Sequence, residues 1–99
     1  GSAGKLVNNL LFAGNLALAK RCLDLGERSG IPRKQLLDFL STGSARSFGL
    51  TVADALLGPN ASRHGADLIR KDVVVAKRFA ARTGTGSDVA EWVEQQLTP

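Results

Sequence analysis

A segment of about 25 residues, 3–27, constrains the fold of this chain more than any other feature. Its apolar residues recur at helical spacing, and Gly30 with Pro32 ends this segment and starts the next. No convincing strand occurs, because Val74 and Val75, the only hint of one, lie where the spacing favours a helix. The sequence therefore predicts an all-α fold of about five helices that opens with one long helix.

Glycine and proline divide the rest of the chain into four shorter helical segments. We expect them at residues 32–40, 45–57, 66–83 and from 87 onward. The residues PNASRHG form a loop, which places His64 outside any helix, and Ser87 is expected to cap the last helix. The faces expected to pack inward are, in chain order, Leu36, Leu37 and Leu40; Phe48, Val52, Ala55 and Leu56; Ile69, Val73, Ala76 and Ala80; and Val89, Trp92 and Val93.

Composition narrows the class of protein. Ninety-nine residues make one domain at most, and 43% hydrophobic with 22% charged residues is typical of a globular protein. The net charge of +4 is too scattered to indicate nucleic acid binding. Cys22 has no partner for a disulfide, and His64 is the only histidine, so we expect a reducing compartment and no metal site. Without a long apolar run or a signal peptide, we expect a cytoplasmic protein with no membrane contact.

The long first segment carries a polar stripe, which we define as Lys5, Asn8, Asn9 and Asn15. At about 100° per residue these side chains fall within a sector of roughly 120°. On the other side lies a wide apolar arc of Leu6, Val7, Leu10, Leu11, Ala13, Gly14, Ala17 and Leu18. Because Phe12 and Leu16 share the sector with the stripe, it is not a simple solvated face. The stripe suits an oriented polar ligand; alternatively, Lys5 is solvated and the asparagines bond backbone or loops.

Three motifs resemble the C-terminal helical domain of the β-hydroxyacid dehydrogenases, the family of 3-hydroxyisobutyrate dehydrogenase, tartronate semialdehyde reductase and, more distantly, 6-phosphogluconate dehydrogenase. The run GKLVNNLLFAGNLALA carries the family's spacing of one glycine, a lysine four residues on, and two asparagines, filled by Gly1, Lys5, Asn8 and Asn9. DLIRKDVVVA is similar to the family's Lys-Asp helix at Lys71, and GSARSF is similar to its serine-rich helix start.

The resemblance implies a C-terminal domain over residues 1–99, like that of 6-phosphogluconate dehydrogenase, with an N-terminal Rossmann domain outside this chain. It implies hydride transfer between NAD or NADP and a short 3-hydroxy acid or its semialdehyde. Dimers or higher homo-oligomers would form through the first helix, and the domain alone would be inactive. These residues contain no G-x-G-x-x-G loop for the cofactor phosphates.

The resemblance also implies roles for single residues. Lys5 would be the general acid/base on the substrate hydroxyl, Asn8 and Asn9 would bind and orient the substrate, and Lys71 would lie near the nicotinamide. Ser44 would contact the substrate carboxylate. A lysine exchanges its proton near neutral pH only where burial or a second cation favours the neutral form, and Lys71 is the candidate for that cation.

Structural readings of the same residues stay open. Lys71 could simply pair with Asp67, four residues before it, and Ser44 could be the N-cap of the third helix. Cys22 reads as a small buried side chain and Trp92 as an apolar anchor. For the whole chain, the alternatives are a helical oligomerisation module without chemistry and, on net charge alone, a small nucleic acid binder.

Overall fold

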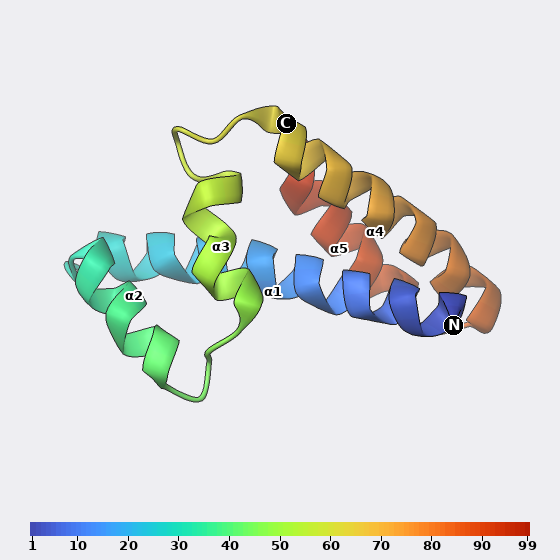
Figure 1. The fold of residues 1–99 in the computed structure, drawn as a ribbon, viewed down its shortest axis with the longest axis horizontal. Coiled ribbons are helices and arrows are strands. Elements are labelled where there is room, and N and C mark those ends of the chain that lie inside the picture. The colour runs from blue at the N-terminus through green and yellow to red at the C-terminus, as the bar shows by residue number, and fades with distance from the viewer.

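The computed structural model describes all of residues 1–99 and contains five helices and no strand (Figure 1). The helices are α1 (Ser2–Arg28), α2 (Arg33–Thr42), α3 (Phe48–Leu57), α4 (Arg63–Thr83) and α5 (Ser87–Leu97). The predicted all-α fold with one long opening helix is therefore confirmed. No helix combines the length and the apolar character that crossing a membrane requires.

The long helix α1 organises the other four, all of which pack against it. In Figure 1, α3 crosses the middle of α1, α2 lies beside its C-terminal end, and the α4–α5 pair lies along its N-terminal half. The molecule measures 43 × 28 × 22 Å. Its long dimension is set by α1, because 27 helical residues at about 1.5 Å each extend roughly 40 Å.

The core lies where α1 meets the other helices. Its buried members are Ala13, Leu16 and Leu23 of α1, Leu50 and Ala53 of α3, Val73 of α4, and Val93 and Leu97 of α5. The predicted stripe of α4 is confirmed, since Val73, Ala76 and Ala80 are buried and Ile69 packs against the core. Helix α2 contributes the partly buried Leu36, Leu37 and Leu40, as expected.

The face predicted for α3 is wrong at two residues, Phe48 and Ala55, both of which are exposed. Phe48 is 71% exposed, and the buried residues are Gly49, Leu50 and Ala53 instead. The physical reason is the close crossing of α3 and α1: a methyl group at Gly49 would stand 2.7 Å from the backbone nitrogen of Leu16. Only the face of α3 that carries this glycine can approach α1 so closely, and the Phe48 ring is turned outward as a result.

The start of α3 and the cap of α5 differ from the expected ones. The Ser47 hydroxyl accepts a hydrogen bond from the Leu50 amide at 3.0 Å, so α3 begins at Phe48 and Ser44 is not its N-cap. Gly86, with φ of 87°, precedes α5, so Ser87 is the first residue of that helix rather than its cap. Glycine adopts this left-handed backbone without the penalty that other residues meet.

The loop before α4 is shorter than expected. Helix α4 begins at Arg63, so His64 lies in its first turn and not in a loop. The Arg63 guanidinium donates hydrogen bonds to Asp67 at 2.8 Å and to the backbone carbonyl of Leu97 at 2.7 Å. These contacts hold the first turn of α4 against the end of α5 and explain why the helix extends upstream of the apolar stripe.

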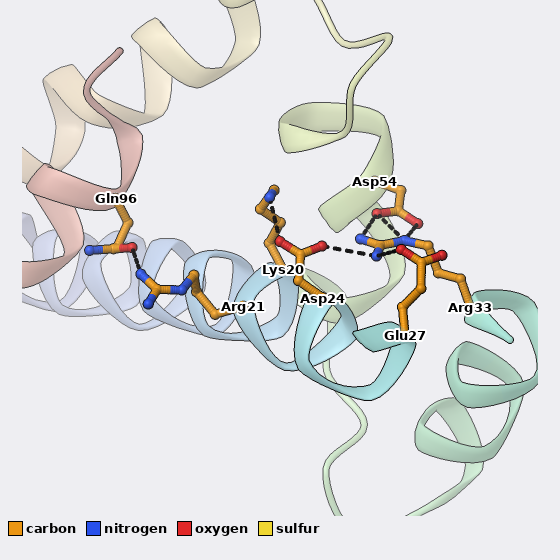
Figure 2. Close-up of polar contacts among 7 residues, drawn as sticks. All are labelled: Lys20, Arg21, Asp24, Glu27, Arg33, Asp54 and Gln96. Atoms are coloured by element: carbon orange, nitrogen blue, oxygen red, sulfur yellow. Dashed lines mark hydrogen bonds and ion pairs between the residues drawn. The ribbon is translucent and has the colours of Figure 1, made fainter. Parts of the chain in front are cut away.

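Ion pairs between the helices add to the contacts that the small hydrophobic core provides. Figure 2 shows the Arg33 guanidinium of α2 between Asp54 of α3, at 2.7 Å, and Asp24 of α1, at 2.9 Å. The hydrogen bonds to Asp54 hold the pKa of Arg33 well above its ordinary value. On the other side of the molecule, Lys77 of α4 pairs with Glu91 and Glu94 of α5, and these contacts raise its pKa.

Several apolar residues lie at the surface, and two of them, on α5, are residues predicted to pack inward. Along α1 the exposed side chains are Val7, Leu11, Leu18 and Leu25, and on α5 Val89 is 55% and Trp92 38% exposed. The expectation that Cys22 is buried is also wrong, since its free thiol is exposed. Four short helices do not cover the full width of the apolar arc of α1.

Candidate functional site

Three members of the polar stripe stand together at the start of α1. Lys5, Asn8 and Asn9 come from its first turns, with Lys5 and Asn8 exposed and Asn9 half-buried. None of their side chains makes a hydrogen bond or an ion pair within the chain. The structural alternative requires hydrogen bonds from Asn8 and Asn9 to the backbone or to loops, and these bonds are absent. A lysine at a helix N-terminus also opposes the helix dipole, so Lys5 does not stabilise α1.

The same face of α1 continues from the polar stripe into the core. Leu16 is fully buried where α3 crosses, and Phe12, one turn nearer the stripe, is half-buried. The Phe12 ring lies 5.7 Å, centroid to centroid, from the ring of Phe48. Lys5, Asn8 and Asn9 therefore lie on the face of α1 on which α3 packs, but before the point where α3 crosses. The Phe12 and Phe48 rings lie between these polar side chains and the buried core.

Two shallow apolar cavities flank this part of α1. One, of about 200 Å³, lies between the start of α1 and the end of α4 and is lined by Leu6, Leu10 and Phe79 among others. The other, of about 190 Å³, is lined by Asn15, Cys22 and Ser47 with apolar neighbours from α1, α2 and α3. Asn15, the fourth member of the polar stripe, therefore faces a different space from Lys5 and Asn9.

Ser44 lies in the exposed loop between α2 and α3 and has no hydrogen-bond partner. The loop is held by Arg46, whose guanidinium donates to the carbonyl of Gly43 at 3.0 Å, and by the Ser47 cap. No hydrogen bond joins Ser44 to α1. The structure leaves its hydroxyl free, but does not bring it into contact with the polar stripe.

Lys71 lies on the exposed side of α4 and has no ion-pair partner. The predicted pairing with Asp67 is wrong, because Arg63 at 2.8 Å and Arg70 at 3.4 Å occupy that carboxylate. Their hydrogen bonds and charges, the Arg63 bond foremost, lower the pKa of Asp67. Lys71 precedes the buried Val73 by two residues, about 200° around the helix, and so points away from the core.

These side chains offer one cation and two amides to a ligand that arrives from outside the chain. An amide presents both a donor and an acceptor, and an ammonium presents three donors, a combination that suits a hydroxy acid. No metal site competes for this role, since no group of three or more His, Cys, Asp or Glu side chains is arranged to hold an ion. Because Lys5 is exposed, burial by these 99 residues does not activate it.

The aromatic pair is the part of the site that the sequence analysis missed. Phe12 was noted as an apolar interruption of the stripe sector, and Phe48 was expected in the core. Gly49 permits the close helix crossing that turns Phe48 outward, but the sequence around it does not indicate which residue of another helix Phe48 meets.

Comparison with known proteins gives one match. A family model described as "NAD-binding of NADP-dependent 3-hydroxyisobutyrate dehydrogenase" matches residues 1–98. Neither the curated proteins nor the solved structures gave a match to this chain. At the level of the family, the match supports an NAD(P)-binding region and an oxidoreductase of the hydroxyacid dehydrogenase kind. Since it covers the chain almost from end to end, this protein belongs to the NAD-binding family of NADP-dependent 3-hydroxyisobutyrate dehydrogenase.

Proposed function

We propose that this chain is the C-terminal helical domain of an NAD(P)-dependent 3-hydroxyacid dehydrogenase, where it binds the substrate and completes the cofactor site. The observation that carries the proposal is the group of Lys5, Asn8 and the half-buried Asn9, which share one face of α1 and have no partner in the chain. Polar side chains placed together and left unpaired are available to a ligand. The family match supports the class of chemistry.

Hydride removal from a carbinol carbon requires that the hydroxyl proton also leaves. Lys5 is the only basic side chain of the polar stripe and takes the role of general acid/base: its neutral amine accepts the hydroxyl proton, and the ammonium so formed steadies the developing alkoxide. Asn9, one turn away on the same face, orients the substrate, and Asn8 binds beside it. The free hydroxyl of Ser44 is assigned to the substrate carboxylate.

The residues present fit one edge of a nicotinamide cofactor, which supplies the hydride acceptor when bound. Lys71 is exposed and unpaired, as a side chain that contacts a cofactor from outside should be. The chain has no glycine-rich phosphate loop, so we assign the phosphates to a Rossmann domain beyond these residues. That domain would also cover Lys5, and burial favours the neutral amine.

The exposed apolar surface of α1 supports a second element of the proposal, a homodimer or higher oligomer formed through this helix. This surface consists of Val7, Leu11, Leu18 and Leu25. The exposed free thiol of Cys22 is compatible with a reducing, cytoplasmic location. A helical oligomerisation module without chemistry is the competing function, supported by the same apolar surface. A glycine-rich Rossmann turn encoded directly upstream of Gly1 favours the dehydrogenase, and its absence favours the module.

The test is the Lys5→Arg variant of the intact parent enzyme. Arginine keeps the positive charge but cannot release a proton near neutral pH, so turnover should fall by about 10²-fold or more with cofactor affinity nearly unchanged. Lys5→Ala should lose a similar factor. Lys34→Arg is the matched control, since Lys34 is 89% exposed on α2 and pairs only with Asp38. Near-normal turnover by Lys5→Arg would overturn the catalytic assignment.

A further inference from the structure

The aromatic pair Phe12–Phe48 lies directly beside the polar stripe. Phe12 follows Asn9 by three residues and Asn8 by four, the two spacings that make neighbours on a helix. Helical side chains lean toward the N-terminus, so the Phe12 ring covers the turn that carries the asparagines. Phe48 stands 5.7 Å from Phe12, with the two ring planes inclined by 30°.

Phe48 is held in place although its ring is open to solvent. On one side, Ser47 caps α3 through the Leu50 amide, and on the other, Gly49 packs on the α1 backbone. The ring itself is 71% exposed. The Ser47 oxygen already accepts a hydrogen bond, whereas the Phe48 ring stands beside Phe12 and open to solvent.

We propose that these two rings form the wall that receives the non-reacting end of the substrate, and that the substrate is a 3-hydroxy acid or semialdehyde whose apolar substituent is larger than a methyl group. The inference rests on the proposed function. From Lys5 to Phe12 the helix rises about 10 Å, and both side chains lean toward the N-terminus, so their separation along the helix stays near ~10 Å. A single methyl group does not span that gap, and a second carboxylate or a phosphate would meet two apolar rings.

The experiment measures kcat/KM of the intact enzyme for a series of 3-hydroxy acids whose substituent grows from methyl to a branched or phenyl group. We expect kcat/KM to rise about three- to four-fold for each methylene that reaches the rings. Phe48→Ala should flatten that rise, so that kcat/KM no longer depends on the length of the substituent. Phe39→Ala is the matched control, since Phe39 is 72% exposed but lies on α2, away from the stripe.

The outcomes separate this proposal from the proposed function. A flat series in an enzyme that oxidises the methyl compound overturns the apolar wall and leaves the dehydrogenase intact. No oxidation of any member overturns the dehydrogenase itself. An equal loss for every substrate in Phe48→Ala, with unchanged thermal unfolding, would mean that the ring contacts another domain and not the substrate, and would also overturn the wall.

Discussion

Gly49 of α3 lies against the backbone of Leu16 in α1, so closely that a methyl group at position 49 would stand 2.7 Å from the Leu16 amide nitrogen. This contact sets how near the two helices come, and it fixes the outward direction of Phe48. The crossing therefore connects the packing of the core to the shape of the candidate site.

We predict that Gly49→Ala destabilises the domain by about 1–3 kcal/mol, because backbone atoms of α1 must move to admit the methyl group. Gly4→Ala is the matched control: it lies in the same kind of helix with no atom near enough to obstruct a side chain. There the change should stabilise by about 0.5–1 kcal/mol through helix propensity. Urea unfolding of both variants checks the prediction. Equal stability for the two would contradict the close crossing.

Acid should weaken the domain through Asp24. The hydrogen bond from Lys20, at 2.6 Å, and the pair with Arg33 lower the pKa of Asp24 below 3.8. A carboxylate with a lowered folded pKa stabilises fully above its unfolded pKa, and the contribution is lost as pH falls through the folded value. Stability should therefore decline below about pH 4.

The Asp24→Asn variant should lose less stability than the parent as the pH falls. Part of the decline should remain, because Arg63 also lowers the pKa of Asp67. The control is Asp38→Asn, because the Lys34–Asp38 pair is largely exposed and contributes little. Thermal unfolding followed from pH 7 to pH 2 measures all three proteins. An unchanged pH profile in Asp24→Asn would contradict the role of the Arg33 and Lys20 contacts.

Local sequence patterns predicted where the helices lie better than they predicted how the helices pack on one another. The stripe of Val73, Ala76 and Ala80 follows from spacing alone, and it is buried as expected. The inward face of α3 does not follow from spacing, since it depends on how closely another helix approaches Gly49. The Arg33 contact to Asp54 joins residues 21 positions apart, which no helical period relates.

The same distinction applies to the candidate site. Lys5, Asn8 and Asn9 belong to one helix, so their shared face was predictable from the sequence. The alternative pairing of Lys71 with Asp67 does not occur, because Arg63 and Arg70 flank that carboxylate and bind it. The pairing of Phe12 with Phe48 arises from the crossing of α1 and α3 and was not predictable from either segment.

Association through α1 is the third prediction. Leu11 is 64% and Leu18 54% exposed, seven residues apart and so on nearly one line of the helix. We expect at least a dimer by light scattering at high micromolar concentration. The double variant Leu11→Lys with Leu18→Lys should be monomeric, whereas Leu68→Lys, at a 50% exposed position of α4, should associate like the parent. A parent chain that is monomeric and binds no hydrophobic dye would contradict the prediction.

The last prediction separates the cofactor from the substrate within the intact enzyme. Asn9→Ala should raise KM for the hydroxy acid, because Asn9 shares a face with Lys5, while KM for NAD(P) stays nearly constant. Lys71→Ala should instead raise KM for NAD(P) by about tenfold and lower the rate, the expected loss of one charge-assisted hydrogen bond. Arg78→Ala is the control, since Arg78 is exposed on nearly the same line of α4, roughly 10 Å farther along. If Arg78→Ala matched Lys71→Ala, general attraction of the cofactor's negative charge would explain the effect, and Lys71 would lose its specific role.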